Sequence, residues 1–214
     1  MTATTVADTG HAADIARAAA RTADSSAARR AMIDSQLRVS GVNDERVLAA
    51  MAAIAREDYL PAAARGHAYI DRAIALGNGQ ALPAPLVQGL MLTEALPAAG
   101  ERVLVISGGS QYLAALVEAM GALVDSIDAG DIGAIRRDQQ PYDLLLIDGA
   151  IEQLPAELYA ALVEGGRVVT GLVLRGVTRL ASGRKLGGAV QLLPLAEVGI
   201  PVLAQFARTK SWSF

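Results

Sequence analysis

Several residue types that build catalytic or structural sites are missing or rare in this chain of 214 residues. It has no cysteine, which excludes disulfides, thiol catalysis and cysteine-bound metals and is compatible with a reducing cytoplasm. Its two histidines, His11 and His67, are too few for a histidine-based metal site. We therefore expect neither a disulfide nor a bound metal.

Excess charge of one sign and long apolar runs are missing too. The formal charge is −3, so the chain lacks the surplus of basic residues that binds nucleic acids or anionic membranes. No apolar run reaches the roughly 18 residues of a membrane-spanning helix. At the N-terminus, no basic flank precedes an apolar stretch, as it would in a secretory signal. These absences predict a cytoplasmic protein with no nucleic-acid or membrane partner.

What the sequence does contain is a strand–helix–strand pattern from Val103 to Asp128. An apolar run leads into a turn of small residues, a segment rich in Ala and Leu, and a second apolar run that ends in an acid, which is typical of a nucleotide-binding βαβ unit. Beside Ser107, the turn glycines Gly108 and Gly109 let backbone N–H groups approach a cofactor, and Asp128 accepts hydrogen bonds from ribose hydroxyls. The alternatives are a strand-to-helix turn without a ligand and a solvated acid.

The link to the next strand is unusually short. Only about thirteen residues, Ala129 to Pro141, separate Asp128 from the apolar run Tyr142–Asp148. This length accommodates one short helix or turn but not a helix and a further strand. Asp148 is expected at the carboxyl end of its strand, where open α/β sheets bind ligands. The alternative is a cap for a helix that begins near Pro155.

The rest of the chain predicts one α/β domain over residues 28–214, behind a flexible leader of residues 1–27. Residues 28–97 form a helical cap and an irregular, cleft-lining loop over 69–85, and residues 98–214 form a Rossmann-like core with one or two antiparallel closing strands. Trp212 and Phe214 alternate with polar residues, as in an edge strand. The remaining expected elements are a helix over Ala28–Val39, a helix capped by Asn43, helices over Leu86–Leu96 and Pro155–Val163, a stop at Glu164–Gly166 and a strand over Arg167–Leu174.

Several longer motifs are more specific than the glycine turn. They are Met32-Ile-Asp-Ser-Gln-Leu-Arg38, Asp44-Glu-Arg-Val-Leu-Ala-Ala-Met51, Arg56-Glu-Asp-Tyr-Leu-Pro61, Ala68-Tyr-Ile-Asp-Arg72, Gly77-Asn-Gly-Gln80 and Leu162-Val-Glu-Gly-Gly-Arg-Val-Val169. With them, the chain from about Ala28 to Phe214 resembles the protein-L-isoaspartate O-methyltransferase family, whose S-adenosylmethionine-dependent enzymes methylate damaged aspartyl residues of proteins.

The resemblance implies a Rossmann-like methyltransferase sheet, mostly parallel with antiparallel closing strands and a small N-terminal helical cap. It implies S-adenosylmethionine as cofactor and isoaspartyl-bearing proteins or peptides as partners. No side chain is assigned a catalytic role, because a carboxylate nucleophile needs positioning rather than acid–base chemistry. The implied cofactor-binding residues are Ser107, Gly108, Gly109, Asp128 and Asp148, and the implied substrate-binding residues are Gln80, Ala81, Leu82 and Pro83. Arg208 is added as a fork donor to a substrate carboxylate, with a surface arginine as the alternative.

Three departures from the family pattern fall on this site. Where the family has Thr-Ile-Ser after Gly-Gln, this chain has Ala81-Leu82-Pro83, which removes two hydroxyls and a backbone donor. Val105, Ser107 and Gln111 replace the acidic residue and further glycines of the cofactor loop, and Gln111 adds bulk there. The family's helix and strand after the ribose-binding acid are largely missing, so the sheet is expected to be truncated after its second core strand.

Two hypotheses follow. The first is a methyltransferase of isoaspartyl residues that works with a reduced site. The second is a non-catalytic relative that keeps the fold as a binding or assembly module. An open crevice above Gly108–Gly109 with Asp128 pointing into it favours the first, whereas a crevice filled by Gln111 or Tyr112 counts against cofactor binding.

Overall fold

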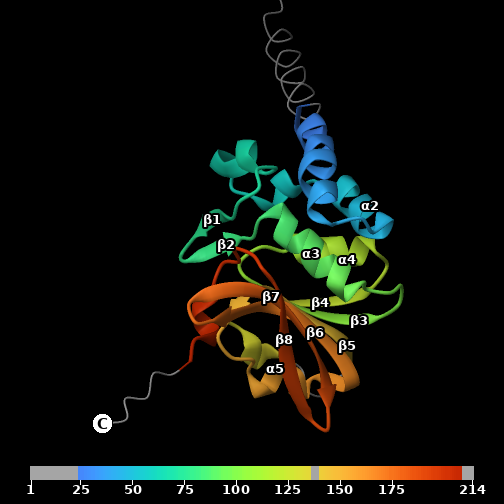
Figure 1. Cartoon of the computed structure of the whole chain (residues 1–214), viewed down its shortest axis with the longest axis vertical. Coiled ribbons are helices and arrows are strands. Elements are labelled where there is room, and N and C mark those ends of the chain that lie inside the picture. The colour runs from blue at the N-terminus through green and yellow to red at the C-terminus, as the bar shows by residue number, and fades with distance from the viewer. Residues whose placement is uncertain (1–23, 136–139, 209–214) are drawn as a thin grey trace, which may run out of the picture.

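The computed structural model describes residues 24–135 and 140–208 of the chain (Figure 1). Its centre is a six-stranded sheet in the order β4-β3-β5-β6-β7-β8, beside a separate two-stranded hairpin, β1–β2. Strands β3 to β6 run parallel, and β7 and β8 are antiparallel to their neighbours. The strands are β1 (Ile74–Gly77), β2 (Gln80–Leu82), β3 (Arg102–Ser107), β4 (Leu123–Asp128), β5 (Tyr142–Ile151), β6 (Leu162–Leu174), β7 (Val177–Leu186) and β8 (Ala189–Glu197).

Helices precede the sheet and connect its strands. Residues 24–32 are α-helical and continue into the π-helical turn η1. The other helices are short, and several are 3-10 turns. Their bounds are η1 (Ile33–Leu37), η2 (Arg38–Ser40), α2 (Glu45–Ala53), η3 (Arg56–Tyr59), η4 (Ala62–His67), α3 (Pro85–Ala95), α4 (Tyr112–Ala119), η5 (Ile132–Ala134), α5 (Ala156–Ala160) and η6 (Ala204–Phe206).

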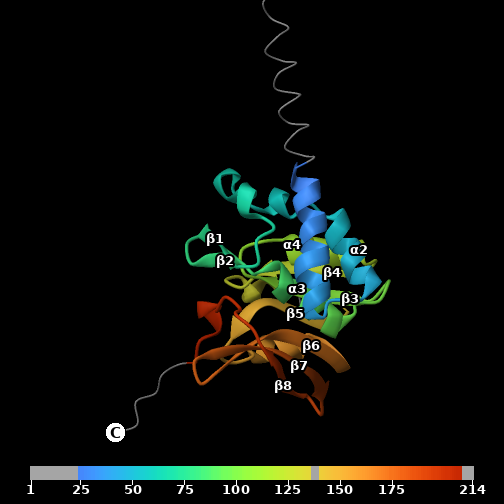
Figure 2. The same ribbon diagram turned by 45° about the horizontal axis from the view of Figure 1, so that its top comes forward.

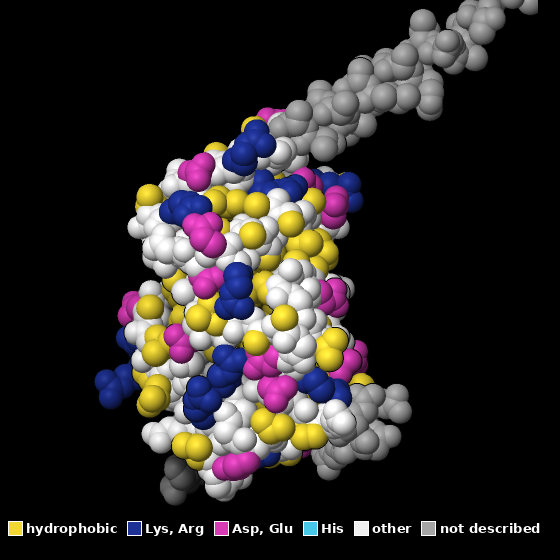
Figure 3. All heavy atoms as spheres, turned by 90° about the vertical axis from the view of Figure 1, so that its right-hand side faces the viewer, with side chains coloured by type: hydrophobic (Ala, Val, Ile, Leu, Met, Phe, Trp, Pro, Cys, Tyr) yellow, Lys and Arg dark blue, Asp and Glu magenta, His cyan; other side chains and the backbone are white. Residues whose placement is uncertain are grey.

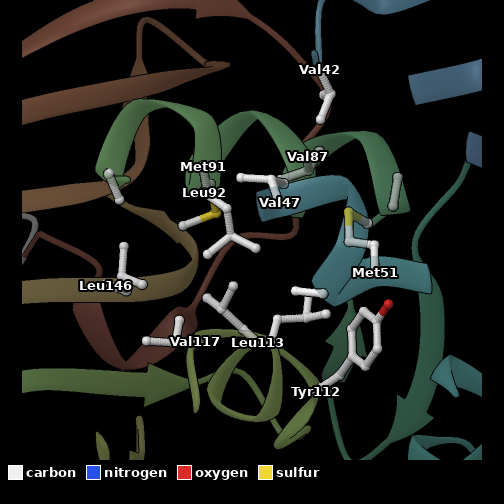
Figure 4. Close-up of a cluster of buried hydrophobic side chains, with 14 of the residues drawn as sticks. Val42, Val47, Met51, Val87, Met91, Leu92, Tyr112, Leu113, Val117 and Leu146 are labelled. Atoms are coloured by element: carbon white, nitrogen blue, oxygen red, sulfur yellow. The ribbon is translucent and has the colours of Figure 1, made fainter. Parts of the chain in front are cut away.

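The central strand β5 divides the apolar residues into two cores, because successive side chains of a strand point to opposite faces of the sheet. Leu144 and Leu146 belong to the larger core, under α2, α3 and α4, whereas Leu145 and Ile147 belong to a smaller core with Leu158 of α5. Figures 1 and 2 show α3 and α4 on one side of the sheet, and Figure 1 shows α5 on the other. In the larger core, side chains of α2, α3 and α4 meet those of β5 (Figure 4).

The predicted α/β class and mixed sheet are confirmed, including the βαβ unit that ends at Asp128 and the two antiparallel closing strands. Among the described residues, only the turn η5 lies between β4 and β5. Strand β4 is therefore an edge of the sheet, and Leu123 is 61% exposed on it.

Four local predictions are wrong. The expected loop 69–85 contains the β1–β2 hairpin, which turns at Asn78. The helix predicted over Pro155–Val163 is only α5, because Leu162 already pairs with Tyr142 of β5. The stop predicted for that same helix, Glu164–Gly166, is as a result looped out inside β6, since Arg167 pairs with Leu144, only two residues further along β5. Strand β5 continues past Asp148 to Ile151.

The fourth concerns the cap of α2. Asp44 rather than Asn43 caps this helix, because the Asp44 carboxylate accepts hydrogen bonds from the backbone N–H groups of Arg46 and Val47, at 2.9 and 3.2 Å. Residues 24–27, assigned to the leader, are helical, and the rest of the leader, like Trp212 and Phe214, lies outside the described residues.

The surface carries both signs of charge. On the face drawn in Figure 3, Lys and Arg side chains alternate with Asp and Glu side chains, and apolar side chains lie between them. Within residues 24–135 and 140–208, no helix has the length and apolar character to cross a membrane.

Candidate functional site

The turn after β3 has the backbone geometry that its glycines suggest. Gly109 adopts a φ of +110°, a conformation that strains any other residue. Gln111, by contrast, has an ordinary φ of −88° and an exposed side chain, and Tyr112 is buried in the larger core. At this position the Gln111 side chain is therefore directed to solvent and that of Tyr112 into the core.

Asp128 ends β4 directly beside Ser107, its register partner on β3. The half-buried carboxylate accepts hydrogen bonds from the Gly130 backbone N–H at Oδ1 (2.9 Å) and from the Gln80 amide at Oδ2 (3.1 Å), and the Ser107 hydroxyl lies 3.5 Å from Oδ2. All three partners are N–H or O–H donors, the same chemical class as ribose hydroxyls. Asp128 thus accepts hydrogen bonds within the protein at this position, and its contact with a ribose stays a prediction.

Two distant segments cover the glycine turn. From the hairpin, the Gln80 side chain packs on Gly109 so closely that a methyl group added there would lie 2.7 Å from it, and the Ala81 N–H donates to the Gly108 carbonyl at 3.3 Å. From the C-terminal segment, Leu203 packs on Gly149 and near Gly108. Figure 1 shows both segments at the same end of the sheet. Gln80 therefore lies directly against Gly109, and Leu203 lies near Gly108.

The residues predicted to hold the substrate fall into different surroundings. Ala81 is half-buried, Leu82 is fully buried in the larger core, and the Pro83 carbonyl accepts from the guanidinium of Arg56. Arg208 binds Glu152, through its backbone N–H to the carboxylate at 2.7 Å and through Nε to the carbonyl at 3.1 Å. Of these residues, Gln80 thus lies beside the predicted cofactor residues, whereas Arg208 contacts Glu152, just after the end of β5.

Asp148 belongs to a buried polar network rather than to an open crevice. Its carboxylate accepts from the Gln88 amide at 2.9 and 3.1 Å, and Gln88 in turn accepts from Arg56. All three side chains are at most 1% exposed. Burial raises the pKa of Asp148 to about 7, against the opposing effects of the Gln88 hydrogen bond and the positive charge of Arg56. Only the backbone of Asp148, close to Gly108, borders the turn.

Sequence reasoning missed Arg56, Gln88 and Leu203. Arg56 stands at the start of a quoted motif, and Gln88 is a polar residue in the otherwise apolar first turns of α3. Those two signals could have suggested a buried pair, since a fully buried arginine requires hydrogen-bond partners. Arg56 also donates to the Ala68 carbonyl at 2.8 Å and lies over the Tyr112 ring, 5.0 Å from its centre. Nothing in the sequence indicated that Leu203 would reach the turn.

A cavity of about 300 Å³ lies beside the predicted substrate segment. It is lined by Asp71 and Arg72 ahead of the hairpin, by Ala84, which follows Pro83, and by Val198 and Gly199 of the C-terminal segment. Asp71 and Arg72 are exposed at this position. The cavity is large enough for a side chain of a bound peptide.

Comparison with known proteins gives matches that extend over most of the chain. Residues 27–129 match the family described as protein-L-isoaspartate(D-aspartate) O-methyltransferase. The protein-L-isoaspartate O-methyltransferase of Koribacter versatilis is 33% identical over 187 residues, which cover 76% of this chain and 84% of that protein. The protein of the same description from Roseiflexus castenholzii is 32% identical, over 85% of this chain and 94% of its own length.

A solved structure shares the fold. It is a putative protein-L-isoaspartate O-methyltransferase from Plasmodium falciparum, in complex with S-adenosyl-L-homocysteine. It superposes with a TM-score of 0.68 over 83% of this chain and 98% of its own, at 17% identity.

Proposed function

Because the chain belongs to the protein-L-isoaspartate(D-aspartate) O-methyltransferase family, we propose that it is an S-adenosylmethionine-dependent carboxyl methyltransferase of isoaspartyl residues with weakened cofactor binding. The observation that carries this proposal is Asp128, a half-buried acceptor at the end of β4 beside the Gly108–Gly109 turn. This position, next to a glycine turn on the neighbouring parallel strand, fits the ribose of a nucleoside cofactor.

The chain's own residues define what the site contributes. Asp128 would hold the ribose hydroxyls, and the backbone of Ser107, Gly108 and Gly109 would approach the rest of the cofactor. When bound, S-adenosylmethionine supplies the methyl group from its sulfonium. The protein supplies orientation and exclusion of water, since a substrate carboxylate needs no general base.

The same residues explain why binding would be weak. A ribose hydroxyl would compete with the Gln80 amide for Asp128 Oδ2, and a ligand placed against Gly108 would meet Leu203. Displacing one hydrogen bond to a charged group costs about 1.5–3 kcal/mol, which corresponds to a roughly 10- to 150-fold loss of affinity. On the acceptor side, Pro83 offers neither a hydroxyl nor an N–H to the substrate carboxylate. We therefore propose slow turnover.

The first test is calorimetric titration of the protein with S-adenosylhomocysteine and S-adenosylmethionine. We expect measurable binding that Asp128→Asn weakens by at least about tenfold, because an amide is a poorer acceptor than a carboxylate. Asp125→Asn is the matched control, since Asp125 lies on the same strand, is exposed and binds Arg102 and Tyr142. Methyl transfer to an isoaspartyl peptide is then measured, with an aspartyl peptide of the same sequence as control.

The second candidate is a non-catalytic relative that keeps the fold as a binding or assembly module. The packing of Gln80 on Gly109 and of Leu203 near Gly108 favours it, because a ligand that approaches these glycines would meet both side chains. Absence of both heat and thermal stabilisation at millimolar ligand would reject the enzyme proposal in favour of this one.

A further inference from the structure

Gln80 connects the predicted substrate segment to the predicted cofactor site. It is the first residue of β2, and its side chain crosses from the hairpin to Asp128, 48 residues later in the chain. On the way it lies against Gly109, the turn residue whose φ only glycine adopts easily. One side chain thus contacts both elements of the cofactor site.

The hydrogen bond that Gln80 makes is of the type a ribose would make. The Gln80 amide donates to Oδ2 of Asp128 at 3.1 Å, while Oδ1 is already bonded to the Gly130 N–H at 2.9 Å. Ser107 adds a hydroxyl 3.5 Å from Oδ2. A ligand hydroxyl that approaches Oδ2 from the side of the Gln80 amide must therefore displace that amide, although a carboxylate oxygen has a second lone pair.

The hairpin that carries Gln80 is attached to the main sheet by few bonds. Strands β1 and β2 form their own two-stranded sheet, and glycines with positive φ, Gly77 and Gly79, flank its turn. A second bond, from the Ala81 N–H to the Gly108 carbonyl at 3.3 Å, connects the start of β2 to the glycine turn. Releasing Gln80 thus removes a main restraint on this end of the hairpin.

We propose that Gln80 is a positioning residue that competes with the donor's ribose for Asp128 and thereby couples donor binding to the position of the acceptor segment. The proposal rests on the proposed function and adds its regulation. In this conformation Gln80 holds the hairpin over the glycine turn. A ribose-bearing donor releases it, and the movement passes to Ala81, the next residue of the acceptor segment, while the buried Leu82 and the bond from Arg56 to the Pro83 carbonyl hold the far end of this segment.

The test is calorimetric titration of S-adenosylhomocysteine into the full-length protein and its Gln80→Ala and Gln80→Asn variants. The side chains of both variants are too short to reach Asp128. The Asn variant keeps the amide group and so controls for a folding defect caused by Ala. We expect about tenfold tighter binding in both variants. Without the Gln80–Asp128 bond, a larger fraction of the molecules has Asp128 free to accept from the ligand. Gln191→Ala, at an exposed glutamine of β8, is the control and should bind as the wild type does.

A second readout separates coupling from a purely structural role. In the wild type, S-adenosylhomocysteine should change the affinity for an isoaspartyl peptide, and the Gln80 variants should lose this linkage. If the wild type binds and the variants bind equally well or more weakly, Gln80 does not compete with the donor, and the proposed function is unaffected. If only the variants bind, the competition by Gln80 is supported, but the wild type is rejected as an enzyme. Absence of binding by all three proteins overturns both proposals.

Discussion

At the residue scale, the most unusual group is Asp148, which is 1% exposed and whose carboxylate accepts two hydrogen bonds from the amide of Gln88. Burial raises its pKa from the ordinary 3.8 to about 7, so between these values the unfolded chain loses a proton that the folded protein keeps. This stabilising contribution is complete below about pH 4 and is lost as the pH rises through 7.

We therefore expect Asp148→Asn to flatten the fall in unfolding free energy between pH 4 and 7, at most by the roughly 1.4 kcal/mol per pKa unit of linkage. An Asn oxygen still accepts from Gln88, so the network is preserved. The measurement is urea unfolding at a series of pH values, with Asp143→Asn as the control on the same strand. Equal pH slopes for wild type and Asp148→Asn would contradict the raised pKa.

Also at the residue scale, Pro83 tests which side of the site limits turnover. Pro83→Ser restores a hydroxyl and an N–H, but Gln80 and Leu203 still cover the glycine turn. We expect kcat/KM for an isoaspartyl peptide to change by less than about fivefold, or about 1 kcal/mol of transition-state free energy. The double variant with Gln80→Ala should exceed both single variants. A large gain from Pro83→Ser alone would show that the donor side opens freely.

At the scale of the element, the cap of α2 distinguishes the sequence-based assignment from the structure. Asp44 accepts two backbone N–H groups, whereas the exposed Asn43 precedes the cap. Asp44→Ala should lower the unfolding free energy by about 1 kcal/mol, and Asn43→Ala should leave it within about 0.5 kcal/mol of the wild type. Thermal and urea unfolding of both variants measure the difference. The reverse order would restore Asn43 as the cap.

At the scale of the whole molecule, residues 28–97 and 98–214 share one core. Met91 of α3 is fully buried in the same cluster as Leu146 of β5 and Leu113 of α4 (Figure 4). Met91→Ala should therefore cost about 2–5 kcal/mol and destabilise both halves together. Hydrogen exchange of α2 and of β5, followed with denaturant, should give one unfolding free energy for both elements. Separate transitions would divide the chain into two domains.

Much of the fold could be predicted because its signals are local. The apolar run Val103–Ile106, the glycine turn and the acid at Asp128 predicted β3, α4 and β4, and the short link after Asp128 agrees with the position of β4 at the sheet edge. Where long-range pairing decided, the prediction failed. Leu162 leaves the expected helix because Tyr142 of β5 is its strand partner, and residues 69–85 become a hairpin by pairing with themselves.

By itself, the sequence determined the family, the α/β class and the chemical type of the residues predicted to bind the cofactor, because motifs and apolar periodicity are properties of contiguous residues. Only the tertiary structure decided how these residues are used. It buried Asp148 with Gln88 and Arg56, and it brought Gln80 and Leu203 onto a turn far from both in sequence. Such contacts depend on how separate segments pack, and composition and spacing along the chain do not specify that packing.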